Sequence, residues 1–252
     1  MLHLCVLVLA LPFPLASALY GGRDAALEGT KAFVRIQTDL GNCTGTVVGA
    51  RWVISASHCV DEDPREPPMI ILQDGTTYET SEVLSYVFTA PEGDIDKFDA
   101  VLFKLPVELE PKYISSISMS ELKVGSTIEV FGYGPNSRAL PERDDTSVGP
   151  LQYGQMKVAH RSKCHGKLAP SKGCTFSENV MFTGGDSGGP VMRKFENCGR
   201  CGLYQVGIIG QQSADREKYV AGSTFTIFQK PLCKWMADKT EGKVKCRTLD
   251  TA

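Results

Sequence analysis

The sequence contains the run Gly184-Gly185-Asp186-Ser187-Gly188-Gly189-Pro190, which places a serine and an aspartate between two pairs of glycines. Because glycine lacks a Cβ atom, the backbone can turn sharply here and leave the Ser187 hydroxyl uncrowded. The same freedom lets backbone N–H groups point towards one place, as the stabilisation of an oxyanion requires. The run therefore fits a nucleophilic serine, but taken alone it fits an ordinary glycine-rich turn equally well.

Two further stretches supply the groups that such a serine needs. Residues 52–59 (Trp-Val-Ile-Ser-Ala-Ser-His-Cys) place His58 at the end of an apolar strand, and residues 98–105 (Phe-Asp-Ala-Val-Leu-Phe-Lys-Leu) place Asp99 at the start of another. A serine hydroxyl is a poor nucleophile at neutral pH and needs a neutral imidazole to take its proton. That imidazole needs a carboxylate to fix its tautomer and stabilise its charged form. The chain order His58, Asp99, Ser187 provides all three groups.

Other acidic and imidazole side chains compete for these roles. Asp94 and Asp96 lie close to Asp99 in the sequence, but only Asp99 directly precedes the apolar strand. His160 and His165 lie outside any comparable pattern, so neither is predicted to be the base.

The three stretches resemble the chymotrypsin/trypsin family of serine peptidases. The Gly-Asp-Ser-Gly-Gly-Pro sequence is identical to the family motif, residues 55–59 are similar to its Thr-Ala-Ala-His-Cys, and residues 99–102 are similar to its Asp-Ile-Ala-Leu. The resemblance extends from Tyr20 to the final helix. It implies a secreted serine endopeptidase that hydrolyses peptide bonds through an acyl-enzyme on Ser187. It also implies oxyanion donors at the backbone N–H groups of Gly185 and Ser187.

By the same resemblance the fold is all-β, with two six-stranded antiparallel β-barrels (chymotrypsin-like), a C-terminal helix, and the site in the cleft between the barrels. The residue pattern agrees, because short apolar or β-branched stretches alternate with turn clusters such as residues 169–173. Strands are predicted at residues 32–37, 44–48, 52–55, 100–105, 127–133, 152–159, 204–209 and 223–228. Pro231 and the apolar Leu232, Trp235 and Met236 predict one helix over residues 231–238.

The first eighteen residues have the pattern of a signal peptide. Residues 4–11 are apolar, and Ala16-Ser17-Ala18 fits the small-residue cleavage rule. The apolar run is too short to span a bilayer, so a membrane anchor is the less favoured alternative. We expect a signal peptide over residues 1–18 and a secreted, extracellular peptidase domain over residues 19–252. Its expected parts are a first barrel (about 19–117), a second barrel (about 118–230), and a C-terminal helix and tail (231–252).

The charge composition limits the classes of partner. Lys and Arg together number 27 and Asp and Glu 29, which gives a formal net charge of -2. No strong basic field exists to attract nucleic acid or anionic lipid. We therefore expect no nucleic acid and no membrane partner. Separately, we expect a monomer with no cofactor and no metal. Protein or peptide substrates and protein inhibitors are the expected partners.

The cysteines indicate disulfides. Nine occur, and Cys5 lies in the predicted signal, so an even number of eight remains for an oxidising compartment. The rival interpretation is zinc, because residues 198–201 have zinc-knuckle spacing and His160, Cys164 and His165 could complete a site. Export argues against thiolate zinc ligands.

The family resemblance implies particular pairs among these cysteines. It pairs Cys43 with Cys59, and it makes Cys164 the expected partner of Cys174. Three pairings remain open for Cys198, Cys201, Cys233 and Cys246, of which Cys198–Cys201 and Cys233–Cys246 are favoured. Asn42-Cys43-Thr44 also fits the glycosylation pattern, although the expected disulfide favours an unmodified Asn42.

The expected specificity pocket departs from the family. By resemblance, the residue six positions before the nucleophile lies at the pocket base, where trypsin-like members carry aspartate. Here it is Met181, followed by Phe182, so a Lys or Arg substrate side chain would lack its charge partner. Gly210-Gln211-Gln212 replaces the usual Ser-Trp-Gly wall, and Gln212 is included in the predicted pocket. Met181 and Phe182 could line an apolar pocket or simply fill it.

The start of the domain suggests an unusual activation. Family members are normally cut after a basic residue, just before an apolar-apolar-Gly-Gly start, and the new ammonium then pairs with the aspartate that precedes the nucleophile. The matching start is Leu19-Tyr20-Gly21-Gly22, preceded by Ala18. One signal-peptidase cut could therefore create the activating terminus, with Leu19 and Asp186 as the pair. Cleavage elsewhere, for example after Ala16, would leave a tail that cannot insert.

Two other functions are alternatives to a peptidase. A catalytically silent relative that serves as a binding protein is the alternative, because the pocket wall is altered although all three catalytic residues are kept. An esterase or lipase of the α/β-hydrolase class needs Gly-x-Ser-x-Gly and a later histidine. Asp186 precedes Ser187 directly and no histidine follows it, so that class is rejected.

Overall fold

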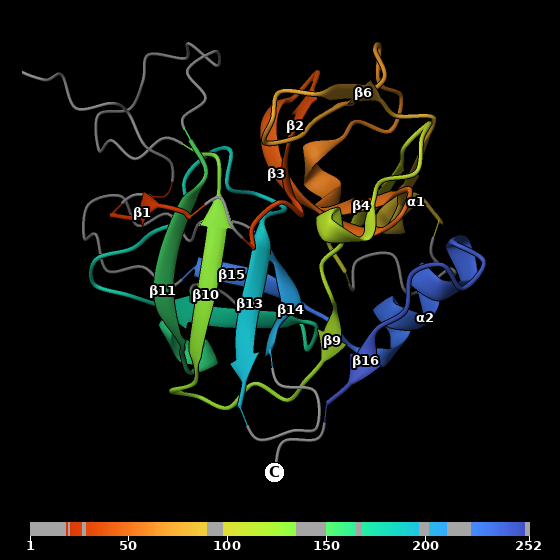
Figure 1. Ribbon diagram of the computed structural model, residues 1–252. Coiled ribbons are helices and arrows are strands. Elements are labelled where there is room, and N and C mark those ends of the chain that lie inside the picture. Colours follow the sequence, from red (N-terminus) through yellow and green to blue (C-terminus); the bar gives the residue numbers. More distant parts are fainter. Residues whose placement is uncertain are drawn as a thin grey trace, which may run out of the picture.

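A computed structural model describes residues 19, 21–26, 29–89, 98–134, 150–164, 168–196, 202–210 and 223–249. Two antiparallel sheets dominate these residues, and the longest helix lies near the C-terminus (Figure 1). This arrangement confirms the expected all-β, chymotrypsin-like class. No helix of the described residues is both long and apolar enough to cross a membrane.

The first sheet has seven strands and is strongly curled (Figure 1). It encloses an apolar core. Three consecutive apolar residues occur in strand β4 because both of its faces are buried. Val53 faces this core, whereas Trp52 and Ile54 belong to a second cluster beneath the C-terminal helix. In spatial order the strands are β6 (Thr77–Glu79), β5 (Met69–Ile71), β2 (Phe33–Thr38), β3 (Gly41–Gly49), β4 (Trp52–Ser55), β8 (Val101–Lys104) and β7 (Glu82–Ser85).

The second sheet forms a closed barrel. In spatial order its strands are β1 (Arg23–Asp24), β11 (Gln152–Val158), β10 (Thr127–Gly132), β13 (Pro190–Phe195), β14 (Gly202–Ile209), β15 (Ser223–Ile227) and β12 (Lys172–Phe176). An additional pairing between β11 and β12 closes six of them, and β1 lies outside on β11. Among the described residues no such pairing joins β6 to β7, so the first sheet is a curled half-barrel with seven strands.

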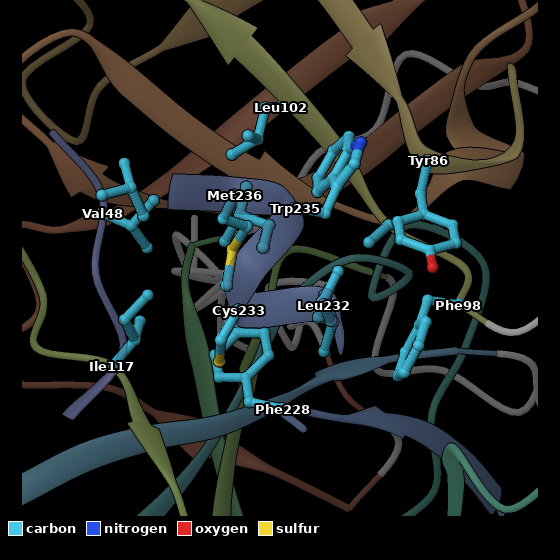
Figure 2. Close-up of a cluster of buried hydrophobic side chains, with 14 of the residues drawn as sticks. Val48, Tyr86, Phe98, Leu102, Ile117, Phe228, Leu232, Cys233, Trp235 and Met236 are labelled. Carbon is cyan, nitrogen blue, oxygen red and sulfur yellow. The ribbon is translucent and has the colours of Figure 1, made fainter. Parts of the chain in front are cut away.

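Helix α2 (Lys230–Lys239) covers the first sheet and supports one part of the candidate site. Figure 2 shows Leu232, Trp235 and Met236 on the helix face that points into a cluster of buried side chains. The ring of Trp235 contacts Tyr86 edge-on at 5.2 Å between centroids, and Tyr86 contacts Phe98 in the same way at 5.2 Å. Because Phe98 precedes Asp99 in the chain, this packing anchors the segment that carries the predicted aspartate.

The tail after α2 runs along the connection between the two sheets. Strand β16 (Arg247–Thr248) pairs in parallel with β9 (Ser118–Met119), which lies between the first and second sheets in the chain. The disulfide Cys233–Cys246 ties this tail to the helix. Buried Ile117 packs into the same cluster as α2, so helix, tail and connection form one unit.

Three of the expected disulfides are present: Cys43–Cys59, Cys164–Cys174 and Cys233–Cys246. Because Cys164 is bound to Cys174, it is not a thiolate ligand for zinc. Cys198 and Cys201 lie outside the described residues.

The strand predictions hold to within a few residues at each end, but several elements were missed. Residues 172 and 173 belong to β12, not to the turn predicted over 169–173, because they pair with Thr226 and Phe225 of β15. Also unforeseen were the short strands β1, β5, β6, β7, β9, β13 and β16, the helix α1 (Tyr86–Thr89), and the 3₁₀ helices Ser57–Cys59, Pro111–Tyr113 and Arg161–Lys163.

Candidate active site

Sheet topology brings His58 and Asp99 together. Strands β4 and β8 are antiparallel neighbours, with Ser55 paired to Val101, so the end of β4 and the start of β8 lie at the same sheet edge. His58 follows β4 in the 3₁₀ helix η1 (Ser57–Cys59), and Asp99 precedes β8. The two predicted residues therefore meet although 41 positions separate them in the chain.

The contacts of His58 define how its imidazole is held. Its Nδ1 lies 2.8 Å from Asp99 Oδ2, and its backbone N–H donates to Asp99 Oδ1 at 3.1 Å. With Nδ1–H donating to the carboxylate, the lone pair on Nε2 is left to accept a proton. Asp94 and Asp96, the competing aspartates, lie outside the described residues.

Neighbouring groups fix the loop that carries this pair. The Ser57 hydroxyl donates to the Ala100 carbonyl, and the Ser85 hydroxyl donates to Ser57 Oγ at 3.0 Å. On the other side of His58, the disulfide between Cys43 and Cys59 joins the loop to strand β3. These bonds lie one residue from His58 or Asp99, so they limit the separation of the pair.

Asp99 is an ionised carboxylate at neutral pH. Burial alone would raise its pKa, but the hydrogen bond and charge of His58, together with the ammonium of Lys172, lower the pKa of Asp99 to about 2. Lys172 lies in β12, and its Nζ is 3.6 Å from Asp99 Oδ2. No sequence motif includes this lysine, which lies 73 positions after Asp99 in the chain.

The loop around Ser187 requires glycine at two described positions. Gly185 has φ +95°, and a Cβ atom there would lie 2.9 Å from the Gly134 Cα. Gly188 has φ +81°, and a Cβ atom there would lie 1.8 Å from the Ser55 hydroxyl oxygen. Both the backbone conformation and the close approach exclude a side chain. Ser187 itself is half-buried.

The backbone N–H groups of this loop divide into two kinds. Three of them donate to backbone carbonyls: Asp186 to Thr183, Gly188 to Ile209 and Gly189 to Asp186. Those of Gly185 and Ser187, like that of the exposed Gly184, have no partner among the residues that the structure describes. Unpaired N–H groups on either side of Asp186 are what an oxyanion site needs.

Thr44, which the sequence reading missed, connects the two halves of the site. It follows Cys43 in β3, and its N–H donates to the Ser187 carbonyl at 2.9 Å. Its hydroxyl donates to the Gly185 carbonyl at 2.8 Å and accepts from the Tyr133 N–H at 3.0 Å. Completely buried Thr44 therefore holds the serine loop against the first sheet. No motif signals such a role.

A contact between Ser187 and Cys59, the residue after His58, brings the serine loop close to the loop of the imidazole. The Ser187 carbonyl oxygen lies 3.9 Å from Cys59 Sγ, the residue after His58. In the described part of the chain no hydrogen bond joins the Ser187 hydroxyl to the His58 ring. In free enzymes such catalytic bonds are often long and tighten when substrate binds.

Asp186 is a completely buried carboxylate that no described cation neutralises. Its Oδ1 accepts from the Gly134 N–H at 2.9 Å, and its Oδ2 accepts from the Thr183 N–H at 2.7 Å and the Thr183 hydroxyl at 2.9 Å. Burial raises its pKa to about 7, although these hydrogen bonds favour the ionised form. The second barrel thus contains a buried carboxyl group whose ionised form lacks a counter-charge among the described residues.

Leu19, the predicted first residue of the mature chain, is also completely buried. It belongs to the core cluster of the second barrel, together with Val180 and Phe182. Its carbonyl accepts from the Gly22 N–H at 2.7 Å. Thr183, which holds Asp186, follows Phe182 directly, so the Leu19 side chain lies in the same cluster as the segment leading to Asp186.

The predicted pocket residues have different surroundings. Phe182 is 1% exposed and lies in the core cluster of the second barrel, whereas Met181 is only half-buried. Of the two, Met181 is therefore the side chain with surface left for a ligand. Gln212 lies outside the described residues.

Comparison with known proteins agrees with this arrangement. A family model described as Trypsin matches residues 19–230. A "Beta-fibrinogenase-like" protein of Daboia siamensis is 24% identical over 204 residues, which cover 75% of this chain and 78% of that protein. "Snake venom serine protease 2" of Protobothrops jerdonii is 24% identical over 210 residues, with the same coverage.

A bacterial protein is also similar. "Glutamyl endopeptidase" of Bacillus licheniformis is 26% identical over 210 residues, which cover 77% of this chain and 61% of that protein. The family match spans most of the chain, and the fold and the His58–Asp99 contact agree with it. The chain therefore belongs to the trypsin family of serine endopeptidases.

Proposed function

We propose that this protein is a secreted endopeptidase that cleaves peptide bonds through an acyl-enzyme on Ser187. One observation carries the proposal: the oriented His58–Asp99 pair lies next to a serine loop in which the N–H groups of Gly185 and Ser187 have no described partner. A base, a nucleophile and oxyanion donors are the three parts that acyl transfer requires.

The proposed reaction uses each group in turn. His58 Nε2 takes the proton of the Ser187 hydroxyl while the oxygen attacks the substrate carbonyl carbon. The resulting oxyanion accepts hydrogen bonds from the Gly185 and Ser187 N–H groups, and Asp99 stabilises the imidazolium. The imidazolium then protonates the departing amine. Water, deprotonated by His58, attacks the acyl-enzyme, and the imidazolium returns this proton to the Ser187 oxygen as the carboxyl product leaves.

A direct labelling experiment tests this function. A fluorophosphonate probe should label the secreted protein, and Ser187→Ala should abolish the labelling. The control is Ser81→Ala, because the exposed Ser81 hydroxyl bonds to the Lys104 carbonyl, away from the site. A secreted, folded protein without labelling would instead favour a catalytically silent relative that acts by binding.

Activation by signal removal is part of the proposal. A terminus at Leu19 would place an α-ammonium on a buried residue of the second barrel, where Asp186 lacks a described counter-charge. A buried charge is strongly favoured to acquire such a partner. Terminal sequencing of the secreted, active protein tests the idea, and an active form that begins at another residue contradicts it.

The primary specificity is proposed to differ from that of trypsin. The family resemblance assigns the half-buried Met181 to the pocket base, where a Lys or Arg side chain would be desolvated without a carboxylate. We expect cleavage after apolar or small residues in a peptide library. A dominant preference for Lys or Arg would contradict this and would require another acidic side chain, such as Asp215 or Glu217, to reach the pocket.

A further inference from the structure

A lysine of the second barrel contacts the aspartate of the first sheet. Lys172 opens β12, and its Nζ lies 3.6 Å from Asp99 Oδ2. The same oxygen lies 2.8 Å from His58 Nδ1. The imidazole and the ammonium therefore share one carboxylate oxygen. The separation of His58 Nδ1 and Lys172 Nζ cannot exceed the sum of these two distances.

The lysine is held in this position by the neighbouring strand. Thr226 of β15 is its register partner, and the Thr226 hydroxyl accepts from Lys172 Nζ at 2.8 Å. The same hydroxyl donates to the Asp99 carbonyl at 3.4 Å. Strands β12 and β15 thus contact both the side chain and the backbone of Asp99.

The ion pair is shielded from solvent. The side chains of Lys172 and Asp99 are 21% and 18% exposed, so salt screens this pair less than an ordinary surface pair. Burial lowers the pKa of Lys172, and the charge of Asp99 opposes that effect. Half-buried, partnered on two sides and close to the base, the lysine differs from a solvated surface charge.

Few charges act on this cluster. Among the described residues, His58 from η1 and Lys172 from β12 are the charged groups that act on Asp99. The other contacting groups, Thr226 from β15 and the Ala100 backbone beside Asp99, are neutral. A change of charge at Lys172 should therefore directly alter the electrostatic environment of the His58–Asp99 pair.

We infer that Lys172 is a positioning residue, which holds the Asp99 carboxylate from the second barrel and extends the activity of His58 to lower pH. When His58 takes the serine proton, two cations share one carboxylate oxygen. A like charge at this range disfavours protonation of the base. The lysine should thus keep the imidazole neutral, and able to accept a proton, in more acidic solution. This inference rests on the proposed function and deepens it.

The test compares Lys172→Met with Lys172→Arg, which removes or keeps the positive charge. In the Met variant the acidic limb of the pH profile of kcat/KM should move upward by about one pH unit, with about tenfold lower kcat/KM below that limb. Above the acidic limbs of both profiles the two variants should differ little, because the base is deprotonated on that side of each limb. In the Arg variant the limb should stay near that of the unsubstituted protein. An unchanged limb in the Met variant would overturn the inference.

A second measurement does not depend on activity or on a stable Met variant. In the unsubstituted protein, the NMR signal of the Lys172 ammonium should shift with the same midpoint as the ring signals of His58. A lysine signal that ignores the histidine titration also overturns the inference. Failure of the proposed function can be distinguished from failure of this inference. The first is recognised by the absence of Ser187-dependent labelling, whatever the NMR result.

Discussion

The two sides of the candidate site are stabilised differently. On the first sheet, His58 and Asp99 bind each other directly, and a disulfide from Cys59 and a hydroxyl from Ser57 fix the surrounding loop. On the second barrel, the loop of Ser187 depends on Asp186, a buried carboxylate without a described counter-charge. The base-side carboxylate therefore has cationic partners, Lys172 of the second barrel included, whereas the nucleophile-side carboxylate has none among the described residues.

The difference shows where control of activity can reside. Two carboxylates, both largely buried, have pKa values shifted in opposite directions: Asp99 to about 2 and Asp186 to about 7. Burial raises both, but Asp99 has cationic neighbours that more than offset it. A new positive charge would thus change the environment of Asp186 far more than that of Asp99.

The largest expected effect comes from removing either side completely. Ser187→Ala, His58→Ala and Asp99→Asn should each lower kcat/KM on the order of ten-thousandfold or more, because the three residues act as one unit. For the same reason a double variant should be little worse than a single one. Peptide hydrolysis and the secreted yield should be measured together. Undiminished turnover by the Ser187 variant would refute the assignment.

Asp186→Asn tests the nucleophile side alone. Its effect should depend on where the chain begins: it should lower the activity of one form and raise the stability of another. In a form that begins at Leu19, the change leaves the buried ammonium unpaired, so activity should fall at least about a hundredfold. In a form with additional residues before Leu19, it should raise stability at neutral pH.

The sign of that second effect follows from the raised pKa of Asp186. Because the folded value of about 7 exceeds the ordinary 3.8, the folded state binds more protons than the unfolded state between these values. Stability of the extended form should therefore fall as the pH rises from about 4 to about 7. Urea unfolding at pH 5 and pH 8 measures this fall, which Asp186→Asn should reduce. An identical fall in the variant would exclude Asp186 as its source.

Thr44→Val should weaken the connection between the two sides. It removes the hydroxyl that bonds to the Gly185 carbonyl and leaves the Tyr133 N–H without that partner. A lost buried hydrogen bond costs about 1–3 kcal/mol, so we expect kcat to fall about tenfold with a small change in KM. Thr44→Ser keeps the hydroxyl and should retain most activity. Undiminished kcat in Thr44→Val would contradict this role of the hydroxyl.

The smallest expected effect is on acid stability and concerns the base side. The pKa of Asp99 is depressed to about 2 from 3.8, so its stabilising effect is present above about pH 4 and is lost as the pH falls to about 2. The loss should be about 2 kcal/mol in the free energy of unfolding. Thermal melts between pH 2 and 5 measure it, and Asp99→Asn should flatten the curve. A variant with the same acid slope would contradict this origin.

Much of this protein follows from short stretches of sequence. The run from Gly184 to Pro190 predicts a loop that depends on glycine. At Gly185 and Gly188 a Cβ atom would lie too close to neighbouring atoms. His58 and Asp99 were identified because each adjoins an apolar strand, and antiparallel pairing brings those strand ends together. Local backbone preference and strand periodicity are properties of neighbouring residues, so they can be recognised before the fold is known.

The tertiary structure decided what depends on strand register between distant segments. Lys172 lies in a stretch with turn-like composition, yet pairing with β15 makes it a strand residue beside Asp99. Thr44 has its role because the serine loop packs against β3. Whether Phe182 lines a pocket or fills the core was likewise fixed by packing, which buries it. Such contacts join side chains far apart in the chain, and no local pattern encodes which of them will meet.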